Sequence, residues 1–527
     1  MIKFKEIIIF FLFSIYFVIG LYLSLDNGIS HDQFHEQQNW KTNFLAIKSI
    51  FFNNTDYKIL SEYLDRYHGV GFHYISQPIQ MFIYEQVAKL KEVSLEGSYY
   101  ISRHAAVFLF FSISSYFFYL LSLKISNNKN FALISMSLFC LYPYFFGHAQ
   151  INGKDIPFMS AWIVCTFFLF NIIDKFYNNS KIEFKTIFYL ALSTAFLISI
   201  RISGILIFLE YLIALIIFLN VKKIKILILI DKNKYFFIFF FILVTIFTYA
   251  LNPIFWHNPF EFVNSLKWMG KYYHDICTLT LGSCMRALNL PSSYIFIWFF
   301  FKLPILILLG LATYPLIEKK IFNNGINTIF YGTFSLTTLS ILFIFIIKNV
   351  ALYDEIRHVM FLIPFIFLIA LYNIYIFNQK FFYYSSIILV IFFILENISL
   401  KNYQYTWLNS FAKFTNIQKT FEVDYMGISN KNLQKEIIKY TNLNYIDKDI
   451  CIYGDMYVRE FLVKKNFTCL RSYSELDSTN VRPLIAYQNV RNIKRNNPKD
   501  CDLIHEEKYQ YSFSNQDVKV ANLWFCD

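Results

Sequence analysis

The sequence predicts an all-α polytopic membrane protein that ends in a small α/β domain outside the membrane. The chain has 527 residues, of which 56% are hydrophobic and only 16% are charged, whereas soluble domains carry about 25% charged residues. Long apolar runs recur as far as residue 399, and short strand-like runs replace them beyond residue 400. We therefore expect a transmembrane domain over 1–399 and an extracytoplasmic α/β domain over 400–527.

The hydropathy pattern predicts about 11 transmembrane helices, because a helix needs about 20 apolar residues to cross the hydrocarbon core. The first resembles a signal peptide, but its apolar run is too long and no small-residue cleavage site follows it, so we expect an uncleaved anchor. The pattern over 185–220 fits either one long hairpin or two tilted helices. The expected spans lie near 6–25, 102–123, 131–146, 157–174, 185–200, 203–220, 235–251, 293–316, 326–347, 359–377 and 380–399.

The lysines predict the orientation of the chain. With a cytoplasmic N-terminus, every inner loop is basic and the short outer loops hold only isolated cations, as the positive-inside rule requires. The C-terminal domain and all the polar clusters then lie outside the cytoplasmic (inner) membrane. These loops explain the net charge of +12, so we expect no nucleic-acid partner. The first outer loop, 26–100, has amphipathic pieces near 41–52 and 77–92 that suit helices lying in the membrane interface.

Asp32 and Glu36, in the first outer loop, are the strongest candidates for catalysis. They are four residues apart and would share one face of a helix. They could act as a base and its positioning acid, or hold a divalent cation together with His35. The alternative is a solvated loop. A minor alternative is zinc proteolysis, because His31 and His35 have the spacing of zinc ligands on a helix, although Asp32 stands where a glutamate usually acts.

A second outer loop, 142–157, crowds His148, Lys154 and Asp155 into a short turn before a span. Asp155 suits the start of the next helix, and capping alone could explain it. Lys154 beside a helix N-terminus is a reasonable anion site. Arg201 lies at the outer end of another span, where it either snorkels to the interface or binds a lipid phosphate through its forked guanidinium.

The outer loop 252–292 contains Trp256 and His257, which suit either the bilayer interface or stacking on a sugar ring. We assign them to acceptor or sugar binding. Cys277 and Cys284 in the same loop could form a disulfide on this oxidising side of the membrane.

The outer loop 348–358 ends in Arg357 and His358, at the start of a long apolar run. Two cationic or potentially cationic groups at the membrane boundary form a second candidate phosphate site. Tyr353 could orient them or face the acceptor.

The region beyond 400 has strand-like runs near 450–453, 484–487 and 518–521 and helix-like pieces near 430–440 and 456–464. Four cysteines in it allow three disulfide pairings, and the linker around 424–427 is suited to fold back on the membrane domain. The cysteines are Cys451, Cys469, Cys501 and Cys526.

Taken together, these motifs resemble the protein O-mannosyltransferase and aminoarabinose transferase families, which are GT-C-type enzymes that use polyprenyl-phosphate sugars. The resemblance covers most of the membrane portion and implies a GT-C-like fold with inverting transfer at the outer face. It also implies that Asp32 is the first-loop acid and Asp155 the second-loop acid. Relatives often read Asp-Glu in the first loop, where this chain has Gln33, so Glu36 is left as the candidate second acid and any metal requirement stays open. The matching segments are Pro143 to Phe158, Arg201 to Gly204, Asn252 to Pro259, Leu352 to His358 and Asp424 to Ser429.

We therefore expect a membrane glycosyltransferase that moves a hexosyl or pentosyl group from a polyprenyl-phosphate-sugar donor to a lipid, glycan or protein acceptor among membrane lipids. The main rival is a transporter or flippase of lipid-linked glycans, which predicts polar residues inside several spans. The expected catalytic residues are Asp32, Glu36 and Asp155; those for the donor phosphate are Lys154, Arg201, Arg357 and His358; those for the acceptor or sugar are Trp256, His257 and Tyr353. The pattern identifies no definite cofactor, and if a divalent metal ion takes part, its candidate ligands are Asp32, His35, Glu36 and His148.

Overall fold

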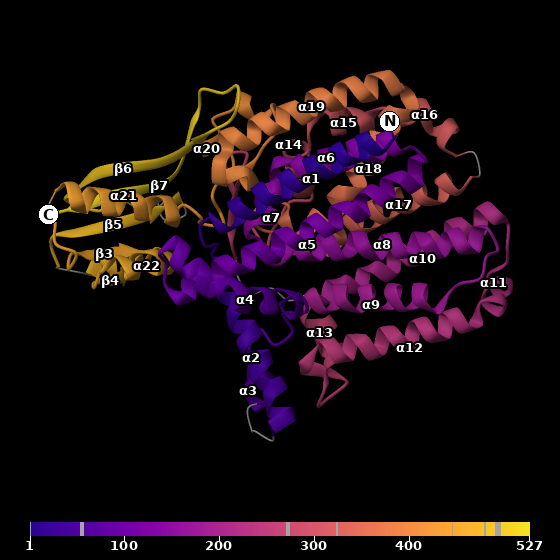
Figure 1. Cartoon of the computed structure of the whole chain (residues 1–527), viewed down its shortest axis with the longest axis horizontal. Helices are drawn as coiled ribbons and strands as arrows, with labels where there is room; N and C mark the ends of the chain where they lie inside the picture. The colour runs from indigo at the N-terminus through magenta and orange to yellow at the C-terminus, as the bar shows by residue number, and fades with distance from the viewer. Residues whose placement is uncertain are drawn as a thin grey trace.

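The computed structural model describes residues 2–52, 57–269, 275–322, 325–444, 446–478, 481–490 and 497–527. Most of the helices run roughly parallel to one another along the long axis of the molecule, and a small sheet lies beyond one end of this bundle (Figure 1). We call that end of the bundle the sheet end. The opposite end of the bundle, which we call the remote end, contains the N-terminus, α11 (Ile226–Lys232) and α16 (Tyr314–Ile321) (Figure 1). Both α11 and α16 have lysines in their last turns.

Seven helical segments of the described chain are long and apolar enough to cross a membrane. This confirms the predicted class of polytopic, mainly α-helical protein. The seven segments are α5 (Leu95–Ser126), α8 (Asp155–Tyr177), η1 with α10 (Ile202–Lys222), α12 (Lys234–Leu251), α17 (Ile326–Ile347), η3 with α18 (Arg357–Phe377) and α19 with η4 (Gln379–Thr406).

Two of the expected spans are broken rather than straight. The run near 131–146 forms α6 (Lys129–Leu141) and α7 (Pro143–Ile151), bent by 57°, and the run near 293–316 forms α14 (Tyr294–Lys302) and α15 (Ile305–Ala312), bent by 115°. Pro143 and Pro304 follow the two breaks, and proline cannot donate the backbone hydrogen bond that would continue a helix. Counting each bent pair as one span gives up to nine spans in the described chain.

The remaining two expected spans are shorter apolar helices, at Phe11–Leu25 within α1 (Ile2–Leu25) and at α9 (Phe184–Ile200). Between α9 and α10 (Ile207–Lys222) lies the short 3-10 helix η1 (Ile202–Leu206). The 185–220 region is thus two helices that are separated by Arg201 and η1.

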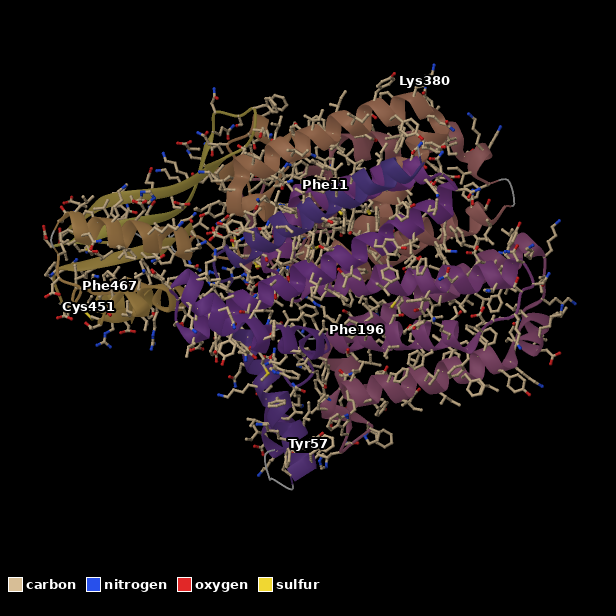
Figure 2. The ribbon with its side chains drawn as sticks, viewed as in Figure 1. Phe11, Tyr57, Phe196, Lys380, Cys451 and Phe467 are labelled. Atoms are coloured by element: carbon tan, nitrogen blue, oxygen red, sulfur yellow. A yellow bond between two sulfur atoms is a disulfide. The ribbon has the colours of Figure 1, made fainter. Side chains whose placement is uncertain are left out.

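The first outer loop folds into α2 (Asp32–Phe52), α3 (Tyr57–Glu62) and α4 (His73–Lys91), so both expected amphipathic pieces are helical. The helices α2 and α3 project across the direction of the bundle rather than along it (Figure 1). Tyr57 lies near the tip of this projection, and Lys380 lies at the opposite, remote end of the bundle (Figure 2).

The outer loop 252–292 contains η2 (Pro253–Phe255), α13 (Glu261–Met269) and the hairpin of β1 (Cys277–Thr280) and β2 (Ser283–Arg286). Cys277 and Cys284 form a disulfide within this hairpin, as predicted.

The sheet beyond the bundle has five strands in the order β4-β3-β5-β7-β6. Both neighbours of β3 are parallel to it, whereas β7 pairs antiparallel with β5 and β6. Of the three possible cysteine pairings, the structure has Cys451–Cys469 and Cys501–Cys526. The elements of this region are η5 (Ala412–Phe414), α20 (Ile417–Thr420), α21 (Asn430–Leu443), β3 (Cys451–Gly454), α22 (Met456–Leu462), η6 (Val463–Lys465), β4 (Leu470–Ser472), η7 (Tyr473–Ser478), β5 (Leu484–Asn489), β6 (Cys501–Gln510) and β7 (Asp517–Cys526).

Candidate functional site

Four of the polar segments predicted to lie outside the membrane meet in one ionic cluster at the sheet end of the bundle. Asp32 begins α2, Asp155 begins α8, Arg201 lies between α9 and η1, and Arg357 begins η3. Four segments far apart in the sequence therefore supply four charged side chains to one place, which we call the ionic cluster.

Arg357 is the central cation of the cluster. Its Nη1 donates a hydrogen bond to the Asp32 carboxylate and lies 4.0 Å from Oδ2 of Asp155, while its Nη2 lies 3.3 Å from Oδ2 of Asp354. The guanidinium carbon lies 5.0 Å from the centre of the Tyr353 ring. Arg357 is buried, and a buried charge is tolerated only where opposite charges and hydrogen bonds compensate its lost hydration.

Asp32 differs from the other acids around Arg357 in its accessibility. Its side chain is 40% exposed, whereas those of Asp155 and Asp354 are buried. Burial raises the pKa of the Asp32 carboxyl, but the charge and hydrogen bond of Arg357 lower it more, so the net pKa lies below its ordinary value. Asp32 is thus an ionised carboxylate that a substrate can reach.

Asp155 is held by both side chains and backbone. Arg201 donates a hydrogen bond to its Oδ1, and the Asn152 side-chain amide donates one to its Oδ2 at 2.8 Å. The Asn152 Oδ1 in turn accepts hydrogen bonds from the backbone N–H groups of Lys154 and Asp155, at 3.1 and 2.8 Å. The start of α8 is therefore capped by Asn152, and Asp155 lies between the two arginines and keeps their guanidinium groups close together.

His358 is partly exposed beside this pair. It lies close enough to interact electrostatically with Arg357, Arg201 and Asp32. The structure thus brings together three of the four residues predicted for the donor phosphate, next to the predicted base.

Lys154, the fourth predicted phosphate ligand, lies in an adjoining buried network. Its Nζ donates to the backbone oxygen of Gly69 and lies 3.6 Å from Oε2 of Glu36. Glu36 also contacts Nε2 of His68 at 2.7 Å and Nε2 of His73 at 3.3 Å. Burial raises the pKa of Glu36, but Lys154 and His68 lower it more, so it lies well below its usual value. Burial lowers the pKa of Lys154 to about 8.

The predicted metal ligands do not come together. Glu36 is buried, whereas His35 is exposed on another face of α2, and His148 is buried against Tyr425 and Asn152. Among the residues that the structure describes, no three histidine, cysteine, aspartate or glutamate side chains are placed to hold a metal ion. The structure therefore does not bring the candidate set of Asp32, His35, Glu36 and His148 together, and it places His31 directly before the start of α2.

A chain of buried polar side chains leads away from Asp155 toward the bundle interior. Asn152 lies 3.0 Å from Nδ1 of His148, and Nε2 of His148 lies 2.9 Å from the Tyr425 hydroxyl. That hydroxyl donates to Oε2 of Glu355 at 3.2 Å, and Lys302 Nζ lies 2.6 Å from the same oxygen. Lys302 and Glu355 are both completely buried. We call this hydrogen-bonded series of Asn152, His148, Tyr425, Glu355 and Lys302 the relay. It connects the ionic cluster to the break between α14 and α15.

Sequence reasoning missed several buried polar groups inside the expected spans. Lys302 ends α14, Arg103 of α5 donates to the side-chain oxygens of Gln33 and Gln37, and Glu210 of α10 accepts a hydrogen bond from the Trp162 indole at 2.6 Å. The available signal was a single charged residue inside an apolar run, and for Lys302 also the proline two residues later.

The segment 424–429 folds back onto the start of α2, as predicted. The backbone N–H of His31 donates to the Met426 oxygen at 2.9 Å. Gly427 has φ +69°, and a Cβ placed there would lie 2.0 Å from the His31 ring, so only glycine fits this approach. Tyr457 of α22 accepts from the Phe34 N–H and donates to the His31 oxygen, both at 3.1 Å. The sheet domain therefore directly fixes the turn that positions Asp32.

Two predicted acceptor residues have other partners. The Trp256 indole donates to the Tyr249 oxygen at 2.7 Å, and the exposed His257 ring packs on Tyr57 with ring centres 3.7 Å apart. The third, Tyr353, packs its ring edge-on to His358 at 4.5 Å and so lies in the ionic cluster.

Comparison with known proteins finds similarity only among solved structures. No protein-family model matches the sequence, and no curated protein matches it. ArnT from Cupriavidus metallidurans in the apo state aligns with a TM-score of 0.45 and 9% identity, over 99% of this chain and 98% of that chain. The same protein bound to undecaprenyl phosphate aligns with a TM-score of 0.40 and 9% identity, over 97% of each chain.

Proposed function

We propose that the protein is a membrane glycosyltransferase that takes its sugar from a polyprenyl-phosphate donor, with Asp32 as the general base. The observation that carries this proposal is the accessible Asp32 carboxylate paired with Arg357, while the buried Asp155 links Arg357 to Arg201. A base and a phosphate site side by side are what transfer from a sugar phosphate requires.

The chemistry follows from these two parts. Asp32 takes the proton of the acceptor hydroxyl or amine while the acceptor atom attacks the anomeric carbon. The bond from that carbon to the phosphate oxygen breaks, and the polyprenyl phosphate leaves with the bonding electrons. A single direct displacement inverts the anomeric configuration. Arg201, Arg357 and His358 stabilise the charge that develops on the phosphate, because forked guanidinium donors match its oxygens.

The ion pair between Asp32 and Arg357 adds a coupling to this mechanism. In the structure the guanidinium lowers the pKa of Asp32 and so weakens it as a base. A donor phosphate bound to Arg357 and Arg201 partly neutralises this positive charge. The pKa of Asp32 then rises toward its ordinary value, and the carboxylate gains basicity when the donor is in place.

We assign the buried acids and Lys154 to supporting roles. Asp155 is the counter-ion that positions both arginines, and Glu36 neutralises Lys154 within the adjoining network. The lysine-bearing remote end faces the cytoplasm under the positive-inside rule. The ionic cluster then lies at the outer surface of the inner membrane, at the level of a lipid-linked phosphate, with the acceptor arriving from outside.

The test is a transfer assay with the purified protein in lipid nanodiscs, supplied with polyprenyl-phosphate hexose and pentose donors. Asp32→Asn keeps the size of the side chain but removes the base, so turnover should fall by roughly 10²–10⁴-fold. The matched control is Glu62→Gln, which alters an exposed acid of the same loop that pairs with the exposed Lys58. It should leave turnover within about twofold of wild type, as expected for an exposed ion pair outside the site. Full activity of Asp32→Asn, or glycan movement across vesicles without turnover of any donor, would refute the proposal.

A further inference from the structure

The turn between β6 and β7 reaches back from the sheet to the transmembrane bundle. In Figure 1 the tip of this hairpin lies close to the sheet end of α19 (Gln379–Leu400). The Tyr511 hydroxyl donates to the Thr406 oxygen at 3.0 Å, and the Gln516 amide donates to the Lys413 oxygen at 2.9 Å. The tip is therefore fixed against the chain that follows α19.

The hairpin tip carries an aromatic side chain that the protein itself leaves uncovered. Phe513 is 81% exposed, and Phe414 of the neighbouring segment is 88% exposed. Between them and α19 lies a hollow of about 450 Å³. We call it the hairpin hollow. It is lined by Phe392, Ser410, Lys413, Phe414, Phe513 and the turn residues 514–516.

The hollow continues the lipid-facing side of a transmembrane helix. Phe513 stacks on Phe392 of α19, with ring centres 6.3 Å apart and planes at 12°. On α19, Ile388, Ile391, Leu395 and Ile398 are all exposed. Their spacing places them along one face. In a span this apolar face contacts lipid tails. Phe392 lies on the same helix and also lines the hollow, so the apolar face and the hollow adjoin.

The lining of the hollow changes from apolar to polar away from α19. Lys413 supplies a cation at its wall, with Nζ 2.7 Å from Glu396 Oε1 and 2.9 Å from the Ser512 oxygen. The same ammonium lies 5.2 Å from the ring centre of Phe392. An aromatic wall on the span side and hydroxyl, amide and ammonium groups on the other side match the glycerol and phosphate region of a phospholipid, where aromatic side chains concentrate.

We propose that the hairpin hollow holds a phospholipid of the adjacent leaflet and that Phe513 inserts into the bilayer interface. The hairpin is then a membrane anchor for the sheet domain. It keeps that domain, and with it the 424–429 segment and Tyr457, at a fixed height above the membrane surface. The inference rests on the lipid-facing surface of α19 and not on the proposed transfer reaction.

The depth of the tip can be measured by power-saturation electron paramagnetic resonance in phosphatidylglycerol and phosphatidylcholine nanodiscs. A nitroxide is attached at Phe513→Cys, at Ile388→Cys on the exposed face of α19, and at Leu443→Cys, an exposed site at the end of α21. The two free cysteines of the chain, Cys140 and Cys165, are buried, and signal from labelled wild type is subtracted.

We expect the label at 513 to show preferential collision with oxygen over a water-soluble nickel complex, at a depth of about 5–10 Å in the headgroup and acyl boundary. The label at 388 should lie deeper, and the label at 443 should report water. A label at 513 that reports water, as the one at 443 does, would overturn the proposal. A second measurement is native mass spectrometry of phosphatidylglycerol retained by the protein. Phe513→Ser should lower the retained lipid by about one molecule per chain, and unchanged retention would overturn the lipid-filled hollow.

Discussion

The buried ion pair between Lys302 and Glu355 offers the most demanding test of the fold around the site. Both side chains are completely buried, and Lys302 Nζ lies 2.6 Å from Glu355 Oε2. We consider Lys302→Met, Glu355→Gln and the double variant. Each single change leaves one buried ionisable group without its partner, whereas the double change leaves two neutral side chains of nearly the original shape.

Removal of one partner of a buried pair costs about 3–5 kcal/mol, and replacement of both is often close to neutral. Burial raises the pKa of Glu355 to about 8 even with Lys302 beside it. Without Lys302, Glu355 can take up a proton at neutral pH, which places the cost of Lys302→Met near the lower figure. That figure, about 3 kcal/mol, is a fall of roughly 10²-fold in the ratio of folded to unfolded protein. Because the folded pKa of Glu355 is raised, wild type loses stability as the pH rises toward about 8. Lys302 lowers this pKa, so in Lys302→Met the loss continues to higher pH, and the cost of the substitution should grow above about pH 8.

The assay is reversible unfolding in mixed micelles, with the three variants forming a double-mutant cycle. The double variant should lie within about 1–2 kcal/mol of wild type. With single costs of about 3 kcal/mol or more each, the coupling energy should then be at least about 4 kcal/mol, above the usual range of 0.5–3 kcal/mol. The control cycle uses Lys124 and Asp174, a partly exposed pair, whose coupling should stay below about 1 kcal/mol. If the losses of Lys302→Met and Glu355→Gln simply add in the double variant, the pair does not act as described.

Three further predictions concern the site. Tyr425→Phe removes the hydroxyl between His148 and Glu355 and should lower kcat/KM for transfer by roughly tenfold, the effect of about 1.4 kcal/mol. Tyr511→Phe, which loses a buried hydroxyl that donates to the backbone oxygen of Thr406, should lower stability alone. Equal kcat/KM values for the two variants would contradict the relay. Burial lowers the pKa of His73 to about 4, so the free energy of unfolding should fall by about 3 kcal/mol as the pH drops from about 6.5 to 4. His73→Gln should flatten this pH dependence in unfolding measurements. An unchanged pH dependence in His73→Gln would refute the assignment of the effect to His73. Arg201→Ala should weaken donor binding by about 1.5–3 kcal/mol, roughly 10- to 150-fold, with Arg201→Lys restoring part of it; unaltered donor affinity in a calorimetric titration would remove Arg201 from the phosphate site.

The helical class and most element positions could be predicted because hydropathy is a local property. The apolar runs that mark the spans do not depend on tertiary contacts, and the lysine asymmetry alone assigns the polar loops to one side of the membrane. Those loops do meet at the sheet end. The breaks after α6 and α14 were missed as breaks, although each is followed by a proline, because a long apolar run dominates a window of about 20 residues.

The pairings within the site could not be read from the sequence. Asp32 and Glu36 were expected to act together because they are four residues apart, but Glu36 is directed to Lys154, His68 and His73, and Asp32 to Arg357. Which partner an acid finds depends on tertiary packing, and spacing along one helix constrains only the face. Tyr425 is a similar case, since its role depends on where the 424–429 segment docks.

The pairing of Asp32 with Arg357 has a consequence for biosynthesis. The two residues are 325 positions apart in the chain. At a synthesis rate of about 5–20 residues per second, the ribosome needs roughly 16–65 seconds after Asp32 to add the arginine that neutralises it. During that time the growing chain contains Asp32 without Arg357, and Asp155 and Arg201 are added in between. A nascent chain interrupted before residue 357 thus lacks the cation around which the acids gather, however many spans have already been inserted. Assembly of the site is therefore a late event in the life of the nascent chain, and it is completed only when the 424–429 segment and Tyr457 have also emerged.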